Sequence, residues 1–271
     1  MSDSQEYLRE SPLNHIGLGM ISIPLAEGKG APNLLQATLV LGLLLWIFTT
    51  TGGQQILVNE MLSEAYDSQA EHFLRGDVGV DGGAIRHEAM IVNGKARMYF
   101  GPFPAFVRIP LNFVYPSGRG HWSRITGFCA GLIALVAFAG LIRLASRSSQ
   151  LSDRWKNWLG NACLIGFALG SPLLLLLGNL SIYDEAIIWA LAWSLAALYF
   201  ALRSRKTEGA ALTRSLLAFS FCGGSALLSR VTFAAPLLLI APVLALRLQR
   251  GCKRQGGDKK TQENLAHGFH G

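Results

Sequence analysis

Long apolar runs separated by polar or basic loops constrain the fold of this chain more than any other feature. A helix needs about twenty apolar residues to cross the hydrocarbon core of a bilayer. Because 51% of the 271 residues are hydrophobic and only 15% are charged, the composition excludes a water-soluble globule, a disordered chain and a fibre. The sequence therefore predicts an all-α polytopic membrane protein. Its apolar runs lie at residues 34–51, 125–145, 158–179, 186–202 and 215–248.

The last apolar run is nearly twice as long as one crossing requires. Ser229 and Arg230 interrupt it, which predicts a tight helical hairpin with spans at about 212–228 and 231–248. Together with the four preceding runs, this hairpin gives about six predicted transmembrane helices. The predicted membrane domain covers residues 34–250.

Lys and Arg residues collect in the loops after the second and fourth spans and in the C-terminal tail. Basic loops remain on the cytoplasmic side of a membrane, so both termini are predicted to be cytoplasmic, in a multi-pass protein of the bacterial inner membrane. Residues 1–33 then form a polar cytoplasmic segment, and residues 251–271 form a basic tail that is predicted to be disordered. This orientation accounts for the net charge of +7 without a nucleic-acid partner. Residues 52–123 become one large extracytoplasmic loop.

The extracytoplasmic loop carries three local signals. Residues 54–74 have the apolar spacing of an amphipathic helix, and Gly76 is expected to end it. Asn93-Gly94 lies between two β-prone segments and predicts a small β-hairpin. Residues 101–116 hold four prolines among large apolar side chains, so we expect a broken helix in the membrane interface.

Four acidic residues of this loop, Glu60, Glu64, Asp67 and Glu71, are spaced to share one helix face. Like charges this close repel one another unless a cation, a basic partner or a substrate hydroxyl lies against them. The pattern leaves two interpretations, which are a solvated helix face and a general base that acts on a substrate hydroxyl. For the second, Asp67 beside Tyr66 is the first choice.

Two further polar groups lie at the predicted outer ends of apolar spans. Tyr183-Asp184-Glu185 either complements the dipole of the following helix or contacts a sugar or an ion bound to a lipid phosphate. Arg230 stands alone between two apolar helices, and its planar guanidinium suits a phosphate; the alternative is an ion pair with the acids of the outer loop. The histidines and cysteines lack the spacing of a metal site, so no metal-binding residues are predicted.

Four stretches resemble the polytopic glycosyltransferases of the GT-C superfamily, including its family 39 protein mannosyltransferase-like and aminoarabinose transferase-like members. The first stretch, EAYDSQAEHFLRG, is similar to a superfamily pattern at Tyr66, Ala70, Phe73 and Gly76. The others are NGKARMYFGPFPAFVRIP, IYDEAIIWALAW and FCGGSALLSRVTFAAPLLLIAPVLAL. The resemblance covers roughly residues 34–250.

Members of this superfamily transfer a sugar from a lipid-phosphate-linked donor, use an acidic residue of the first outer loop as the base, and sometimes require a divalent metal. The resemblance therefore implies a membrane glycosyltransferase in which Asp67 or Glu64 is the catalytic base. The implied partners are a polyprenyl-phosphate-linked sugar donor and an extracytoplasmic or lipid acceptor. The candidate substrate-binding residues are Tyr66, Tyr99, Asp184, Glu185 and Arg230.

Two departures from the superfamily pattern support an alternative. Leu62-Ser63 stand where the superfamily has an Asp-Glu pair, and six spans are predicted where eight or more are usual. The alternative is a truncated or degenerate member, acting as a non-catalytic membrane subunit or lipid-binding protein beside a membrane protein partner. Spans with few charges and no inverted repeat disfavour a transporter or channel.

Overall fold

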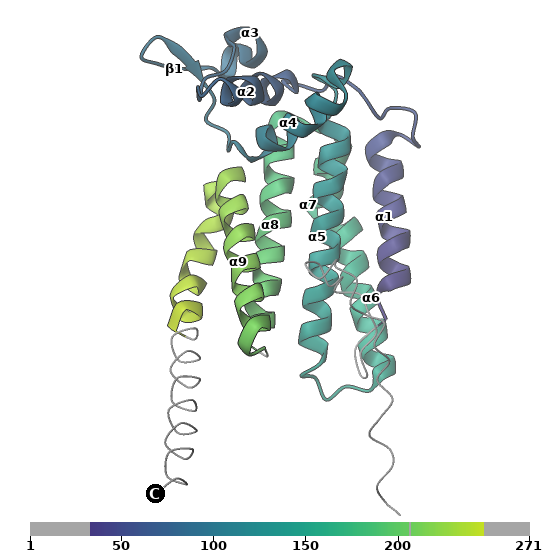
Figure 1. Ribbon diagram of the computed structural model, residues 1–271. Coiled ribbons are helices and arrows are strands. Elements are labelled where there is room, and N and C mark those ends of the chain that lie inside the picture. Colours follow the sequence, from purple (N-terminus) through teal and green to yellow (C-terminus); the bar gives the residue numbers. More distant parts are fainter. Residues whose placement is uncertain (1–32, 206, 247–271) are drawn as a thin grey trace, which may run out of the picture.

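A bundle of apolar helices forms most of the computed structural model, and a polar headpiece (residues 56–122) lies across one end of this bundle (Figure 1). The structure describes residues 33–205 and 207–246. The predictions for residues 1–32 and for the tail at 251–271 fall outside these ranges.

Within the described ranges, four helices are long and apolar enough to cross a membrane. They are α5 (Ser123–Ser146), α6 with its continuation α7 (Asp153–Gly170 and Pro172–Gly178), α8 (Ile182–Ser204) and α9 (Gly209–Ser229). α8 packs against both α5 and α9. The chain is therefore mostly helical, as the composition predicts.

Two shorter apolar helices, α1 (Leu35–Thr50) and the final helix (Val231–Leu246), complete the bundle. α9 ends at Ser229 and the final helix begins at Val231, so the predicted break in the last apolar run is confirmed. The described residues thus contain four candidate spans, and six crossings remain a prediction.

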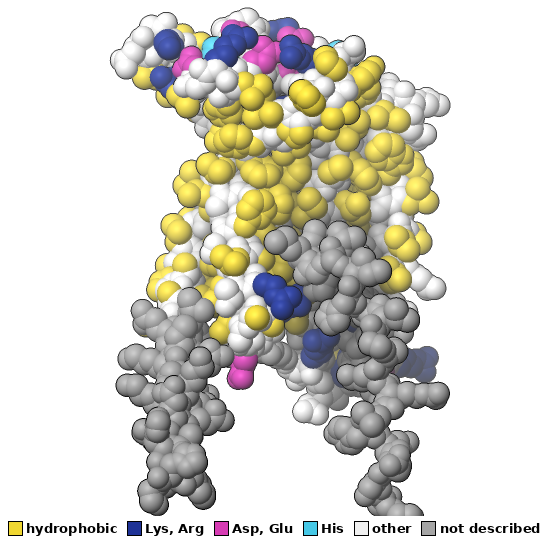
Figure 2. All heavy atoms as spheres, in the orientation of Figure 1, with side chains coloured by type: hydrophobic (Ala, Val, Ile, Leu, Met, Phe, Trp, Pro, Cys, Tyr) yellow, Lys and Arg dark blue, Asp and Glu magenta, His cyan; other side chains and the backbone are white. Residues whose placement is uncertain are grey.

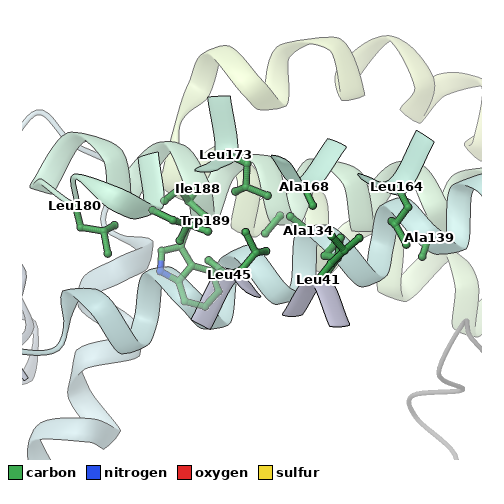
Figure 3. Packing of buried hydrophobic residues seen from close by; sticks show 14 of the residues in the cluster. Leu41, Leu45, Ala134, Ala139, Leu164, Ala168, Leu173, Leu180, Ile188 and Trp189 are labelled. Atoms are coloured by element: carbon green, nitrogen blue, oxygen red, sulfur yellow. The ribbon is translucent and has the colours of Figure 1, made fainter. Parts of the chain in front are cut away.

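One hydrophobic core joins α1, α5, α6, α7 and α8 (Figure 3). Leu45 of α1 and Ala134 of α5 are fully buried in it. Small residues on α5 let its neighbours approach closely. Gly131 is an example, because a Cβ atom there would lie 3.0 Å from Cδ1 of Leu177 in α7.

The outward faces of the bundle are apolar. Figure 2 shows hydrophobic side chains in a band between the charged headpiece and an opposite end that carries Lys and Arg. Such a band buries its apolar surface in the hydrocarbon region of a bilayer. The residues that are at least 60% exposed on these faces include Leu39, Leu43, Leu175, Leu217, Phe221 and Leu239.

We call the end of the bundle opposite the headpiece the basic end. α5 and α8 both finish there, and α6 and α9 both begin there. The basic residues at these helix ends are Arg143, Arg147, Arg154, Lys156, Arg203, Arg205 and Arg214.

The headpiece contains the predicted β-hairpin. Asn93 and Gly94 have φ angles of 52° and 74°, as the two central residues of a type I′ turn require. The two paired strands are only three residues long, shorter than the β-prone segments around the turn. In chain order the headpiece elements are α2 (Glu64–Leu74), α3 (Gly82–Ile85), η1 (Arg86–Glu88), β1 (Met90–Val92), β2 (Lys95–Arg97), α4 (Phe103–Val114) and η2 (Pro116–Gly118).

The helix predicted over residues 54–74 is wrong in its first half, because α2 begins only at Glu64. Leu62 has a φ of 59°, a left-handed conformation that an α-helix cannot contain. The segment before it pairs instead with the start of α8, where the backbone N–H of Ile182 donates to the carbonyl of Met61 at 3.3 Å. This pairing attaches the headpiece to the bundle.

The break predicted in the proline-rich segment is also wrong, because α4 is one continuous helix. Pro102 and Pro104 lie at its start, where backbone N–H groups have no partner within the helix, and Pro116 lies beyond its end. Only Pro110 is internal. The position of each proline, rather than the number of prolines, determines whether the helix is broken.

The surface of α4 is inverted relative to that of a water-exposed helix. Its buried residues include Arg108 and Asn112, whereas Phe113 and Val114 are 89% and 80% exposed. A helix in water buries its apolar side chains, so this distribution fits a helix whose outer face contacts lipid at the membrane interface.

Candidate functional site

A buried ion pair joins the headpiece to the bundle. Nη2 of Arg108 in α4 lies 2.7 Å and 2.9 Å from the two carboxylate oxygens of Glu185 in α8, and both side chains are fully buried. The Thr126 hydroxyl donates to Glu185 at 2.7 Å, and the Ser123 hydroxyl accepts from Arg108 at 3.1 Å. These hydrogen bonds replace part of the hydration that the two charges lose on burial. These four residues therefore form a specific connection between the two parts of the chain.

Sequence reasoning found only Glu185 of this pair and assigned it to substrate. In the structure its carboxylate is occupied by Arg108 and Thr126. The signal for Arg108 was present in the sequence, because it is the only charged residue in the apolar segment FPAFVRIPLNFV. An isolated charge in such a helix requires a partner.

Asp67 is a second connection, within the headpiece. Its carboxylate is 4% exposed and accepts hydrogen bonds from the side-chain amide of Asn112 at 2.7 Å and from the backbone N–H of Gly120 at 2.8 Å. The indole N–H of Trp122 holds Asn112 from the other side at 2.8 Å. Asp67 thus ties α2 to α4 and to the loop that leads into α5. The base role predicted for Asp67 remains a prediction.

The other acids of the predicted stripe are distributed around the headpiece. Glu64 is exposed and accepts a hydrogen bond from Asn59 at 2.9 Å, which leaves it accessible to a substrate. Glu60 pairs with Arg124, and Glu71 pairs with both Arg75 and Arg119. Two of the four acids, Glu60 and Glu71, are therefore paired with basic side chains. In the part of the chain that the structure describes, no three His, Cys, Asp or Glu side chains lie together as a metal site would require.

Asp184 caps α8. The Ser181 hydroxyl accepts from the backbone N–H of Asp184, and the Asp184 carboxylate accepts from the backbone N–H of Ser181 at 3.1 Å. This reciprocal arrangement is a capping box, which stabilises the first turn of a helix. The cap interpretation of Asp184 thus matches the geometry, and a substrate contact remains a prediction.

Three tyrosines and one glutamate lie near the junction of the headpiece with α8. Tyr66 is fully buried and its hydroxyl donates to the carbonyl of Ile182 at 3.2 Å; burial raises its pKa well above 10. The Tyr99 hydroxyl donates to Glu88 at 2.6 Å, and the phenols of Tyr183 and Tyr99 both lower the pKa of Glu88. Glu88 was not singled out from the sequence, since only the fold brings it to the two phenols.

Arg230 lies at the same junction. It directly follows Ser229, whose carbonyl oxygen lies against Gly101 of the headpiece. The side chain is half-buried, and no carboxylate among the described residues lies within 4.0 Å of its guanidinium nitrogens. An ion pair with an acid of the outer loop, one of the two predicted alternatives, is thus absent from the described chain. The guanidinium remains available to an anion.

Substituting Gly101 tests the contact between the headpiece and the end of α9. A Cβ atom at this position would overlap the carbonyl oxygens of Leu228 and Ser229 at the end of α9. We expect Gly101→Ala to lower the free energy of unfolding by about 1–3 kcal/mol, as overpacking does. The midpoint of unfolding in detergent, followed by tryptophan fluorescence, measures the effect. Gly223→Ala is the control, because a Cβ there meets no atom within 4 Å; an equal loss in both variants would contradict the contact.

Glu88 predicts a pH dependence of stability. The hydroxyl of Tyr183, and then that of Tyr99, lowers the pKa of Glu88 from its ordinary value of 4.5. A pKa that is lower in the folded state stabilises the fold above pH 4.5, and this stabilisation is lost as the pH falls through the folded pKa. Tyr99→Phe should therefore destabilise the protein more at pH 7 than at pH 3. Unfolding midpoints that differ from wild type equally at both pH values would exclude this role.

The geometry defines the class of protein. The described chain is a mostly helical protein with a small two-stranded sheet and four candidate membrane-spanning helices, which indicates a membrane protein. Comparisons with models of known families, with curated proteins and with solved structures gave no match to this chain.

Proposed function

We propose that this chain is a membrane glycosyltransferase that moves a sugar from a polyprenyl-phosphate-linked donor to an extracytoplasmic or lipid acceptor. The observation that carries the proposal is Arg230, a half-buried guanidinium without a carboxylate partner among the described residues, at the junction of headpiece and bundle. A planar guanidinium in this position suits the phosphate of a lipid-linked donor. The sequence resemblance to the GT-C superfamily supports the same reaction.

In the proposed reaction, a carboxylate of the headpiece acts as the base and removes the proton of an acceptor hydroxyl. The acceptor oxygen then bonds to the anomeric carbon of the sugar, and the bond from this carbon to the donor phosphate breaks, with its electron pair remaining on the phosphate. Arg230 offsets the charge that develops on this leaving group. The headpiece would face the periplasm of a bacterial inner membrane, with the basic end and both termini cytoplasmic.

The test is transfer of radiolabelled sugar from a panel of polyprenyl-phosphate donors by membranes that contain this chain alone. Asp67→Asn and Glu64→Gln distinguish the two candidate bases. We expect transfer to fall at least about a hundredfold when the true base is replaced, the range of general base catalysis. Since Asp67 also holds Asn112 and Gly120, its variant requires an unfolding measurement beside the transfer assay. Loss of transfer with an unchanged unfolding midpoint would support the base role, and normal transfer would exclude it.

The alternative is a non-catalytic membrane subunit or lipid-binding protein that keeps part of a GT-C fold. The observation that favours it is the Asp67 carboxylate, whose two oxygens are both engaged by donors of the headpiece. This alternative predicts that no donor of the panel supports transfer, and that the chain co-purifies with a complete transferase.

A further inference from the structure

A groove opens between α8 and the final helix at the basic end. Closer to the headpiece the two helices are joined, where the Ser194 hydroxyl donates to the carbonyl of Phe233 at 3.2 Å. Toward the basic end they enclose a groove of about 630 Å³. This volume lies within the range of pockets that hold small organic molecules.

The walls of this groove are apolar and open to the surroundings of the bundle. Leu239 and Val243 of the final helix are 79% and 63% exposed, and Leu202 of α8 faces them across the groove. Arg205, at the end of α8, is the one charged residue among its described lining residues, and its side chain is exposed. The groove therefore combines an apolar surface with one positive charge at the basic end of the bundle.

The charge at the rim of the groove selects the occupant. This charge is Arg205, and no acidic residue is among the described lining residues of the groove. Basic pockets between membrane helices bind the headgroups of anionic lipids. We propose that this groove binds one anionic phospholipid, with an acyl chain against Leu239 and Val243 and its phosphate at Arg205.

A second groove at the same end provides a matched comparison. It lies between α5 and α6, holds about 260 Å³, and has Lys156 among its lining residues. The ammonium of Lys156 lies 3.6 Å from the Asp153 carboxylate. Lys156→Gln thus removes a cation from the same end of the bundle without touching the proposed site.

Native mass spectrometry of the full-length chain in detergent tests the proposal, with phosphatidylglycerol and phosphatidylcholine of identical acyl chains added in equal amounts. We expect one phosphatidylglycerol to be retained at least about fivefold in preference to phosphatidylcholine, the factor that one basic residue contributes near an anionic surface. Arg205→Gln should bring this ratio close to one, and Leu239→Trp, which fills the groove, should reduce retention of both lipids. Lys156→Gln should leave the ratio unchanged.

The opposite outcomes overturn the proposal. Equal retention of the two lipids by the wild-type chain would remove the selectivity for anionic headgroups. A preference that survives Arg205→Gln, or that Lys156→Gln abolishes equally, would place any lipid elsewhere on the basic end. The measurement does not involve sugar transfer, so it stands whether or not the proposed enzyme activity is found.

Discussion

Replacing Arg108 with methionine is expected to lower the free energy of unfolding by about 3–5 kcal/mol, the cost of leaving one member of a buried ion pair without its partner. Glu185 is fully buried, and the Thr126 hydroxyl alone cannot replace the guanidinium. Because the pair joins α4 to α8, we expect the headpiece to separate from the bundle first. The free energy of unfolding in detergent measures the loss.

A double variant separates the charge from the packing. Arg108→Met combined with Glu185→Leu removes both charges and should recover most of the lost stability, as apolar replacement of buried pairs does. Arg75→Met is the matched control, since it breaks a pair with Glu71 in which the arginine side chain is 68% exposed, and it should cost at most about 1 kcal/mol. If the double variant were as unstable as Arg108→Met, the loss would come from packing rather than from the isolated charge.

Replacing Arg230 with alanine is expected to reduce sugar transfer by about 10- to 100-fold at limiting donor. A hydrogen bond to a charged group contributes about 1.5–3 kcal/mol, and each 1.4 kcal/mol corresponds to a factor of ten. Arg230 has no carboxylate partner among the described residues, so its removal leaves no buried acid uncompensated. The fold should therefore survive the change, and the effect should appear in donor binding.

Two further variants make this prediction specific to the phosphate. Arg230→Lys keeps the charge but loses the planar fork, so transfer should recover only in part. Arg214→Ala removes an exposed arginine at the other end of α9, where its guanidinium bonds the Ala210 carbonyl of its own helix, and should leave transfer unchanged. Unchanged transfer in Arg230→Ala would exclude the phosphate role, whereas equal losses in Arg230→Ala and Arg214→Ala would indicate a general dependence on basic charge.

Local chemistry was sufficient to predict several features of the fold. Asn93-Gly94 predicts its turn because few residues adopt two successive positive φ angles. Arg230 predicts the break between the last two helices because a charge is costly within an apolar span. The prediction of a broken helix in the proline-rich segment failed because proline is tolerated at the start of a helix. The start of α4 could not be located from composition.

The contacts of the candidate site depend on residues far apart in the sequence, which no local pattern reveals. Arg108 and Glu185 are separated by 77 positions, and Asp67 and Asn112 by 45. The acidic stripe correctly drew attention to Asp67, but spacing on one helix cannot show that Asn112 and Gly120 occupy both oxygens. The sequence thus identified chemically important residues, and the fold decides which of them remain accessible.

The attachment of the headpiece to α8 also sets an order of events during biosynthesis. Met61 pairs with Ser181, and Arg108 pairs with Glu185, so both contacts need a helix that is synthesised more than seventy residues after the headpiece segment that it holds. Until α8 is in place, Arg108 has no counter-charge, and the segment cannot bury it at low cost. We therefore expect the headpiece to reach its final structure only after α8 has been synthesised.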